Sequence, residues 1–549
     1  MHQLILMALL AGSTSVSHPQ SVPQLRDNTT IDTMLAVGGT HNYAFRLPQG
    51  GSISATVLQE GVDVVVEIRG NRDTIPVLFD SPNGRNGPDL VEVFTSTPQS
   101  YILTIRPFDA GEPAGHYKLI VQDVRDARRT ARLLGERRQA RAEASTWLRA
   151  RSSQHVSVEA ITVAQQFALD QVAARVRIVG LGEATHGSRE FGDARLAITK
   201  RLVERYGYRV IALEASATRL SEKQAIEAGW IGRRTQGDLV AWVKQYNARN
   251  PNDSVRVVGV DAQDFAPARA ELREFIGLAY GTGALARWLP LEAELAAADS
   301  QSAVFGDASV KPEVRAAVLE LLGVLHLDAP LLLRRYGFQA SVAIRMIEIL
   351  AQFADFNGDG GGVVSHGRDW YMALNVLRAL DRQGANAKAV YWAHNAHVAK
   401  AGLRTTGGVL QEVVGCDYAA VALTFGAGGF VAQLPNDLED RLVTANLPAG
   451  PAETVESVMA GVGPAIEAAA WACDQRDAPA WLRSPQRMHW VGALFTPGTP
   501  PSQAYRPFDL ISAFNGILYI PRVTADVIYN DRPLIPARQT TARPSQIDE

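Results

Sequence analysis

The hydrophobic pattern of this chain changes its period near residue 125, and this change limits the possible folds more than any other feature. Between residues 31 and 124, apolar and polar residues alternate in short runs that Gly, Pro, Asn and Asp clusters separate. A period of two is typical of strands with one buried face, so residues 31–124 are predicted to form a small all-β sandwich. The candidate strands are 41–47, 52–58, 62–68, 90–94, 100–106 and 116–122.

Beyond residue 155, runs of apolar β-branched residues alternate with amphipathic stretches of helical period. This alternation predicts an α/β domain over residues 155–535, with a largely parallel, buried central sheet and a helical insertion. The predicted strands are 176–180, 209–213, 255–260, 387–392 and 419–424. The predicted helices are 189–206, 221–231, 234–247, 266–280, a long stretch over 311–357, and 368–382.

The segments outside these two domains have compositions of their own. Residues 125–154 are rich in Ala, Arg, Leu and Glu, which predicts a connector helix. Its many arginines favour a solvated surface over an anionic partner or a membrane surface. An apolar run over residues 4–11, followed by small polar residues, is typical of a signal peptide at 1–17 and predicts a periplasmic or secreted protein; the alternative is a disordered or buried apolar N-terminus. Residues 536–549 are predicted to be a disordered tail.

The composition excludes several classes of function. Hydrophobic residues make up 46% of the 549 residues and charged residues 20%, as in soluble globular proteins of two or three domains. The net charge of −3 offers no positive field for nucleic acid. No long apolar run follows the N-terminus, so no membrane span is expected. Cys416 and Cys473 lack a CxxC or zinc-ligand spacing and form either one disulfide or two buried thiols.

Four of the predicted strands end in an acid or a histidine. The carboxyl ends of the strands line the ligand crevice of an open α/β sheet, so these side chains are expected at one site. A single Glu at a strand end more often accepts backbone N–H bonds or caps a helix. Four such ends together favour acid and base catalysis by carboxylates and imidazoles. The residues at these ends are Glu183 and His186, Glu214, Asp261, and His394 with Asn395 and His397.

Two parts of the chain resemble known families. The hairpin over residues 101–119 resembles the pre-peptidase C-terminal jelly-roll modules, which implies a non-catalytic accessory domain that binds a carbohydrate or a protein surface. The domain over 155–535 resembles the erythromycin esterase family. The matching segments are Gly182-Glu183-Ala184-Thr185-His186-Gly187, Glu190-Phe191 with Arg195, Leu213-Glu214, Gly259-Val260-Asp261, Arg368-Asp369 through Met372 to Asn375, Trp392-Ala393-His394-Asn395-Ala396-His397, and Phe508-Asp509.

The second resemblance implies a carboxylic ester hydrolase that acts on a small-molecule ester, such as a macrolide lactone, and needs no metal or other cofactor. By motif position, His186 is the general base that activates a water molecule, and Glu183 beside it orients or polarises that water. His394 is implied as a second essential imidazole. The remaining implied catalytic residues are Arg195 and Glu214, and the candidate substrate-binding residues are His397, Asn395, Asp261, Arg368 and Asp369.

Absent motifs fit this interpretation, but two other functions stay open. The chain has no GxSxG, SxxK, HExxH, P-loop or GxGxxG sequence, so the usual signatures of serine hydrolases, zinc proteases and nucleotide-binding proteins are missing. The same Glu and His side chains are also acceptable ligands for Zn²⁺ or Mn²⁺, and a metal would activate the water instead. A degenerate hydrolase that binds its ligand without cleaving it is the third interpretation. Arg368 and Asp369 could equally be an ion pair at a helix start.

Overall fold

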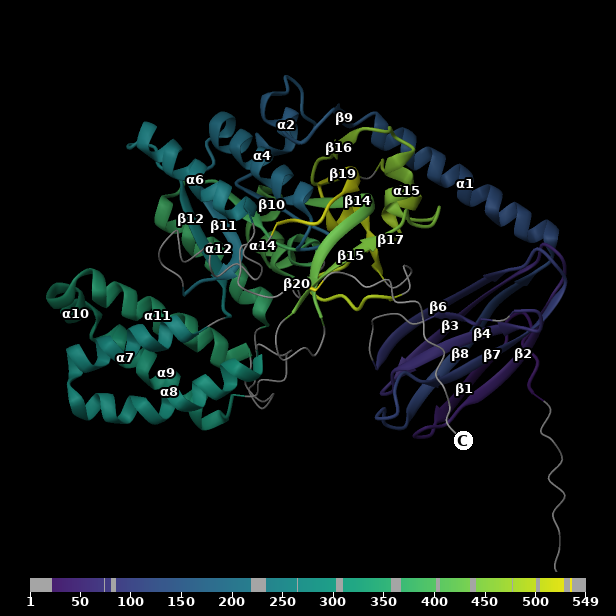
Figure 1. Cartoon of the computed structure of the whole chain (residues 1–549), viewed down its shortest axis with the longest axis horizontal. Helices are drawn as coiled ribbons and strands as arrows, with labels where there is room; N and C mark the ends of the chain where they lie inside the picture. The colour runs from purple at the N-terminus through teal and green to yellow at the C-terminus, as the bar shows by residue number, and fades with distance from the viewer. Residues whose placement is uncertain are drawn as a thin grey trace, which may run out of the picture. The chain divides into compact units, whose positions relative to one another are not determined.

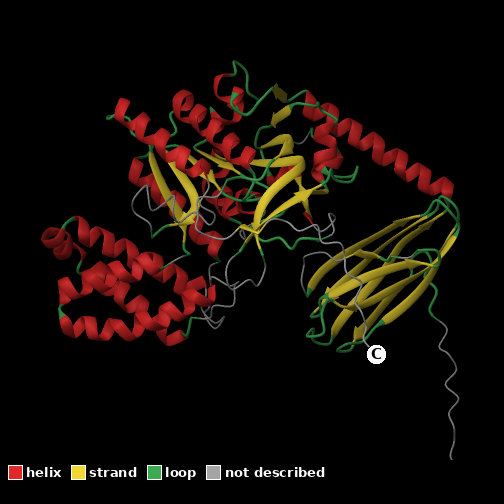
Figure 2. Ribbon diagram, in the orientation of Figure 1, coloured by secondary structure: helices red, strands yellow, loops and turns green. Residues whose placement is uncertain are grey.

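The computed structural model describes residues 22–73, 75–79, 85–218, 234–263, 265–302, 310–356, 367–400, 405–434, 441–475, 477–499, 504–527 and 534–535. The chain divides into two compact units, Met1–Gln139 and Ala140–Glu549. Each unit is described by itself (Figures 1 and 2). The predicted signal peptide and the predicted disordered tail lie outside the described residues.

The first unit contains two antiparallel four-stranded sheets, ordered β1-β8-β3-β6 and β2-β7-β4-β5. Alternate side chains from both sheets, such as Phe45, Ile53 and Leu103, form one buried core. The predicted β-sandwich is confirmed. The structure adds β1 and β5, which are edge strands with mostly exposed side chains and therefore lack a clear buried alternation. The strands are β1 (Thr30–Leu35), β2 (His41–Leu47), β3 (Ser52–Glu60), β4 (Val64–Gly70), β5 (Val77–Phe79), β6 (Asn86–Phe94), β7 (Gln99–Pro107) and β8 (Gly115–Arg125).

Helix α1 (Ala127–Arg149) lies within the predicted connector and has residues in both units. In the first unit, Arg137 Nη1 is 2.6 Å from Glu92 Oε2. In the second unit, Ser145 Oγ donates to the Val458 carbonyl at 3.1 Å, and Ala144 is fully buried. Arg137, Arg141 and Arg149 of this basic segment therefore bind residues of the protein itself.

A ten-stranded mixed sheet is the centre of the second unit, in the order β12-β11-β13-β10-β14-β19-β16-β9, with β15 and β20 beyond β14. The predicted α/β domain is confirmed, with a mixed sheet. Neighbours from β12 to β19 are parallel, whereas β16 is antiparallel to β19 and β9, and β15 to β14. The strands are β9 (Ser152–His155), β10 (Ile178–Leu181), β11 (Val210–Ser216), β12 (Arg256–Asp261), β13 (Ala389–Trp392), β14 (Tyr418–Gln433), β15 (Leu442–Leu447), β16 (Ile466–Ala470), β19 (Gly516–Val523) and β20 (Leu534–Ile535), and β17 (Pro485–His489) pairs separately with β18 (Tyr505–Asp509).

Helices cover both faces of this sheet, because adjacent residues of each apolar strand enter different cores. Val179 belongs to the core under α4 (Arg189–Tyr206) and α6 (Arg234–Arg249). Ile178 belongs to the core under α12 (Arg368–Gln383) and α14 (Thr406–Val414). The shorter helices of this unit are α2 (Ala160–Val163), α3 (Asp170–Ala173), α13 (Asn395–Val398), α15 (Val455–Ala460), α16 (Leu510–Ala513), η2 (Gly415–Asp417) and η3 (Ala480–Arg483).

The helical insertion has an apolar core of its own. Its helices are α7 (Ala266–Tyr280), α8 (Thr282–Ser302), α9 (Pro312–Leu327), α10 (Ala329–Tyr336) and α11 (Phe338–Phe356). The long helical stretch predicted over 311–357 consists of three helices, because the chain bends by 67° between α9 and α10 and breaks again at Gly337, whose φ is +53°. The predicted helix over 221–231 lies outside the described residues.

Cys416 and Cys473 form a disulfide, with 5.7 Å between their Cα atoms. It links η2, at the start of β14, to the segment that follows β16. Among the described residues, no single helix is long and apolar enough to cross a membrane, and one bent pair, α9 with α10, meets the length and composition test together.

Candidate active site

The loop after β10 places Glu183 and His186 above the centre of the sheet. All residues of β10 are buried, and the strand lies between β13 and β14. A side chain at Gly182 would not fit, because its Cβ would lie 2.0 Å from Asn395 Oδ1. The loop then leads into α4. Polar side chains thus follow an apolar strand at its carboxyl end, where ligand crevices of such sheets form.

Glu183 connects His186 to Arg195. Glu183 Oε1 lies 2.8 Å from His186 Nδ1, and Oε2 lies 2.6 Å from Arg195 Nη2. Both ion-pair partners are desolvated, since Glu183 is 2% and Arg195 4% exposed. The Arg195 guanidinium also lies 4.9 Å from the centre of the Trp392 ring. With its Nδ1–H donated to Glu183, a neutral His186 carries its lone pair on Nε2 and is oriented as a general base.

His394 packs against His186 but has different partners. The two ring centres are 5.3 Å apart. His394 Nδ1 accepts the Ala396 N–H at 3.2 Å, so its Nε2 carries the proton and donates to the Ala184 carbonyl at 3.3 Å. Burial, and then the neighbouring His186, lower the pKa of His394 to about 3. His394 is therefore a neutral hydrogen-bond donor at neutral pH.

Glu214, near the end of β11, connects the strand ends of β11 and β13. Its Oε2 accepts the His394 backbone N–H at 2.8 Å, and its Oε1 lies 3.1 Å from Arg368 Nη2. Burial alone would raise the pKa of Glu214, but the charges of His397, His186 and Arg368 hold that pKa well below its usual value. Glu214 is therefore ionised.

His397 lies between two carboxylates. Its Nδ1 is 2.8 Å from Asp369 Oδ1, and its Nε2 is 3.3 Å from Glu214 Oε1. Burial alone would lower the pKa of His397, but Glu214 and Asp369 outweigh burial and raise it to about 10. His397 is thus a cation at neutral pH, whereas His394, three residues earlier, is neutral.

Arg368, the first residue of α12, binds Asp261 at the end of β12. Its Nε and Nη2 lie 3.0 and 2.6 Å from the two oxygens of Asp261, a bidentate geometry. Burial lowers the pKa of Arg368, but the charges of Asp261 and Glu214 outweigh it and raise the pKa above its ordinary value. Arg368 and Asp369 bind different partners, since Asp369 binds His397.

Asn395 lies at the same edge of the sheet, and its side chain forms hydrogen bonds with the backbone of β14. Its Nδ2 donates to the Leu423 carbonyl at 2.9 Å, and its Oδ1 accepts the Leu423 N–H at 3.1 Å. Asn395 is 0% exposed. Its amide thus joins the loop after β13 to β14.

Thr406 and Trp490 belong to this region and were not predicted from the sequence. The Thr406 backbone N–H and Oγ1 contact Asp369 Oδ1 at 2.7 and 2.8 Å. The Trp490 ring lies edge-on to His394, with 5.1 Å between ring centres. Thr405 caps α14 by accepting the Gly408 N–H, so the Thr-Thr-Gly-Gly run was a helix-start signal that could have pointed to Thr406. Nothing in the sequence pattern indicates Trp490.

The alternative of a metal site depends on how these side chains point. Among the described residues, no three His, Cys, Asp or Glu side chains are placed to share one ion. His394 Nδ1 accepts a backbone N–H, and the Nδ1 atoms of His186 and His397 contact carboxylates. The imidazoles thus bind the protein instead of converging on a common point.

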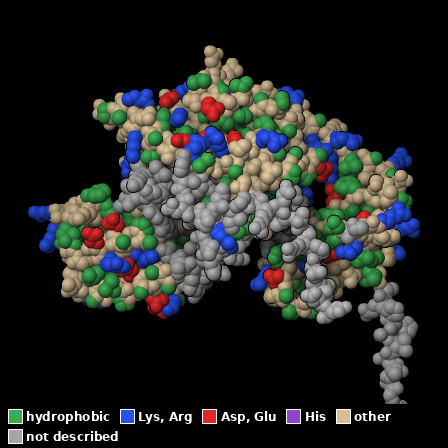
Figure 3. Space-filling model, in the orientation of Figure 1, with side chains coloured by type: hydrophobic (Ala, Val, Ile, Leu, Met, Phe, Trp, Pro, Cys, Tyr) green, Lys and Arg blue, Asp and Glu red, His purple; other side chains and the backbone are tan. Residues whose placement is uncertain are grey.

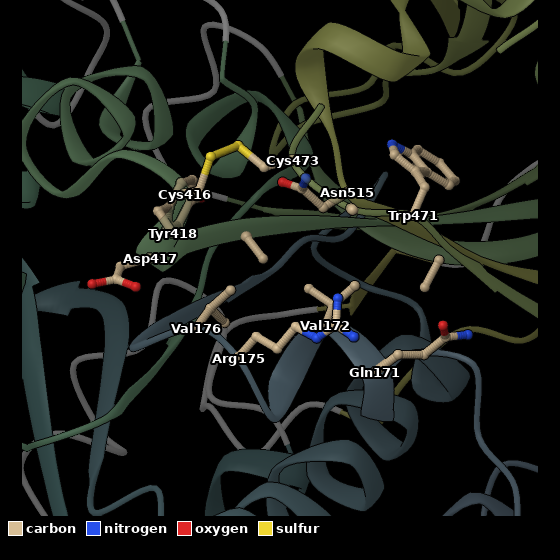
Figure 4. Close-up of a pocket in the computed structure, with 13 residues that line it drawn as sticks. Gln171, Val172, Arg175, Val176, Cys416, Asp417, Tyr418, Trp471, Cys473 and Asn515 are labelled. Carbon is tan, nitrogen blue, oxygen red and sulfur yellow. A yellow bond between two sulfur atoms is a disulfide. The ribbon is translucent and has the colours of Figure 1, made fainter. Parts of the chain in front are cut away.

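A cavity of about 320 Å³ lies at the opposite edge of the sheet. Figure 4 shows Tyr418 and Asn515, near the starts of β14 and β19, beside the Cys416–Cys473 disulfide. Because these residues lie at the amino ends of the parallel strands, the cavity is separate from the site around Glu183 and His186.

Comparisons with known proteins identify the family of the second unit. The family model described as erythromycin esterase matches residues 203–523, more than half of the chain, and includes Glu214, Asp261, Arg368 and His394. The chain is 26% identical over 294 residues to "Erythromycin esterase type I" of Escherichia coli, over 47% of this chain and 71% of that protein.

Solved structures are similar to each part of the chain. A Bacillus cereus protein has the same fold, with a TM-score of 0.57 and 19% identity over 71% of this chain and 99% of that one. The pre-peptidase C-terminal domain of a Bacillus anthracis collagenase is 25% identical, over 19% of this chain and 97% of that domain, with a TM-score of 0.16. Because the matching family model covers more than half of its residues, this chain belongs to the erythromycin esterase family.

Proposed function

We propose that this hydrolase cleaves a carboxylic ester by attack of a water molecule that His186 deprotonates. The observation that carries the proposal is the buried Arg195–Glu183–His186 chain of contacts. It fixes the Nδ1–H tautomer, so that Nε2 accepts the proton of the water while the water oxygen attacks the ester carbonyl. The negative charge of Glu183 also stabilises the imidazolium that forms.

In this proposal, Glu183 orients the His186 imidazole, and it is His186 that deprotonates the water. Both of its oxygens have partners, His186 on one and Arg195 on the other. A carboxylate engaged in this way orients the base in the manner of the acid in a Ser-His-Asp triad. Water takes the place of the serine, and no covalent intermediate forms.

His394 is the proposed donor to the tetrahedral intermediate. Its Nε2–H makes a long bond of 3.3 Å to the Ala184 carbonyl, which also accepts the Val491 N–H at 2.8 Å. An oxyanion that develops beside His186 is a stronger acceptor than this shared carbonyl. Ionised Glu214 holds the His394 backbone and thereby fixes the position of the donor.

A macrolide lactone is the first substrate to test, because a relative bears the name erythromycin esterase. The experiment is a screen of purified protein against macrolides of two ring sizes and simple aryl esters, beside the His186→Ala variant. We expect hydrolysis of at least one ester and its loss in the variant, with an unchanged circular dichroism spectrum. Turnover retained without His186 would remove the proposed base.

Dialysis against EDTA tests the metal-free part of the proposal. Activity is expected to be unchanged, because the side chains near the proposed water site bind one another and the backbone. A loss of activity that Zn²⁺ or Mn²⁺ restores would favour a metal-bound water instead.

We also propose that the chain is exported to the periplasm or the medium. The disulfide supports this location, because such bonds persist mainly in oxidising compartments. Cell fractionation tests it, and a protein found in the cytoplasm with two free thiols would contradict it.

A further inference from the structure

An exposed apolar surface that includes two arginines lies where α9, α10 and α11 meet. We call Leu327, Leu331, Arg334, Arg335 and Phe338 the α10 surface. Leu327, Leu331 and Phe338 are 84%, 70% and 80% exposed. Helix α10 lies at the outer end of the helical insertion in Figure 1, and Figure 3 shows Lys and Arg side chains at that end. Large apolar side chains and positive charges are thus exposed together in and next to α10.

The geometry of α10 explains why these side chains point outward. Leu331, Arg334 and Arg335 share one face of the helix, since their spacing is i, i+3 and i+4. Leu332 lies on another face, is 6% exposed and belongs to the core of the insertion. Leu327 lies two residues before the first residue of α10, Phe338 two residues after its last, and both are exposed. One face therefore anchors α10, and the other is exposed.

The apolar and arginine side chains of the α10 surface favour one class of partner over others. Soluble monomers rarely expose several large apolar side chains together, unless these bind a partner. An apolar partner surface would offer no anions to the guanidinium groups of Arg334 and Arg335, the second of which lies 5.3 Å from the centre of the neighbouring Tyr336 ring. The interface of an anionic phospholipid bilayer provides acyl chains for the apolar groups and phosphates for the arginines.

We propose that the α10 surface docks the protein on an anionic phospholipid membrane. Leu327, Leu331 and Phe338 enter the boundary between headgroups and acyl chains, to a depth of about 5–10 Å. Arg334 and Arg335 bind lipid phosphates, and their forked donors suit that geometry. In this proposal the α10 surface lies in the interface of the bilayer, and the attachment is reversible.

Sedimentation with vesicles tests the docking. The full chain is mixed with vesicles of phosphatidylcholine alone and with vesicles that also contain phosphatidylglycerol. We expect binding to the anionic vesicles at least tenfold tighter than to the neutral ones, and weaker binding at high salt. Equal binding to both, or no binding to either, would overturn the proposal.

Matched variants locate the binding surface. The Leu331→Glu/Phe338→Glu protein and the Arg334→Gln/Arg335→Gln protein should each lose binding to anionic vesicles by about tenfold or more. Val413→Glu is the control, because Val413 is 57% exposed on α14, away from the helical insertion. Full binding by both α10 variants would contradict the assignment. So would a wild-type dimer in analytical ultracentrifugation that the Leu331→Glu/Phe338→Glu change dissociates, because the surface would then bind a second copy of the chain.

Discussion

At the scale of single residues, the surroundings of each histidine decide its charge. His394 and His397 are three positions apart in one short segment. His394 has backbone partners and a neighbouring imidazole, so burial keeps it neutral. His397 has a carboxylate on each side, so it is charged. The sequence indicated both imidazoles, but it contained no sign of their opposite protonation states, because the acids that decide them come from β11 and α12.

The charge of His397 predicts a pH dependence of stability. Its pKa is raised from 6.5 to about 10 in the folded protein, so its stabilising contribution is complete below pH 6.5 and is lost as the pH rises towards 10. The His397→Asn variant should therefore be much less stable than the wild type at pH 6 and closer to it at pH 10. Urea unfolding across this range measures the gap; a gap that stays constant would show that His397 is neutral.

Thr406 is expected to hold Asp369 in position for His397. The Thr406→Val variant loses the hydroxyl donor to Asp369 but keeps the shape of the side chain, and should lower the free energy of unfolding by about 1.5–3 kcal/mol. Its effect on His397 distinguishes positioning from packing, because a less firmly held Asp369 lowers the pKa of that imidazole in NMR titration. Thr406→Ser should restore both values. An unchanged His397 pKa in the valine variant would refute the positioning role.

At the scale of secondary structure elements, the buried strands follow from the sequence pattern, whereas the angle between two consecutive helices does not. Strands such as β10 and β11 are apolar runs with a polar residue at or near the end, so both the sheet and the edge that holds the candidate site follow from the sequence. The break between α9 and α10 has a local signal, because Pro330 lies in the first turn of α10 and has no backbone N–H to continue α9. The apolar pattern nevertheless runs on through both helices, and the bend angle of 67° depends on packing against the rest of the insertion.

A substitution at Gly182 tests how tightly the segment after β10 packs against the loop after β13. In Gly182→Ala, the added Cβ meets Asn395 Oδ1 and displaces the amide that binds Leu423. We expect a loss of about 1–3 kcal/mol in the free energy of unfolding. Gly323→Ala in α9 is the control, since a Cβ there meets nothing within 4 Å and should leave stability equal or raise it by about 0.5–1 kcal/mol. Equal stability of the two variants would mean that the loop has room to adjust.

At the scale of the whole molecule, the sequence predicted an N-terminal sandwich and a C-terminal α/β domain because their hydrophobic periods differ. The sequence left open whether Cys416 and Cys473 form a disulfide or stay as two buried thiols. The pairing depends on how β14 and β16 lie in the sheet, separated by β19, and on the redox conditions of the compartment.

The disulfide is expected to contribute measurably to stability. It closes a loop with a sequence separation of 57 residues. A loop of that length corresponds to about 4 kcal/mol of lost chain entropy in the unfolded state. The Cys416→Ala/Cys473→Ala protein should therefore unfold at a clearly lower urea concentration than the wild type, and added reductant should destabilise only the wild type. If reductant leaves the wild type unchanged, the two thiols are not joined.

The central claim is that Glu183 orients His186 as the base, and the Glu183→Gln variant tests it most directly. The amide that replaces the carboxylate can donate to His186 Nδ1, which favours the tautomer with its proton on Nε2 and leaves no lone pair for the water. With an ester that the wild type cleaves, we predict a fall in kcat of about 10³-fold or more and an unchanged circular dichroism spectrum. A kcat within about twofold of the wild type would contradict the account.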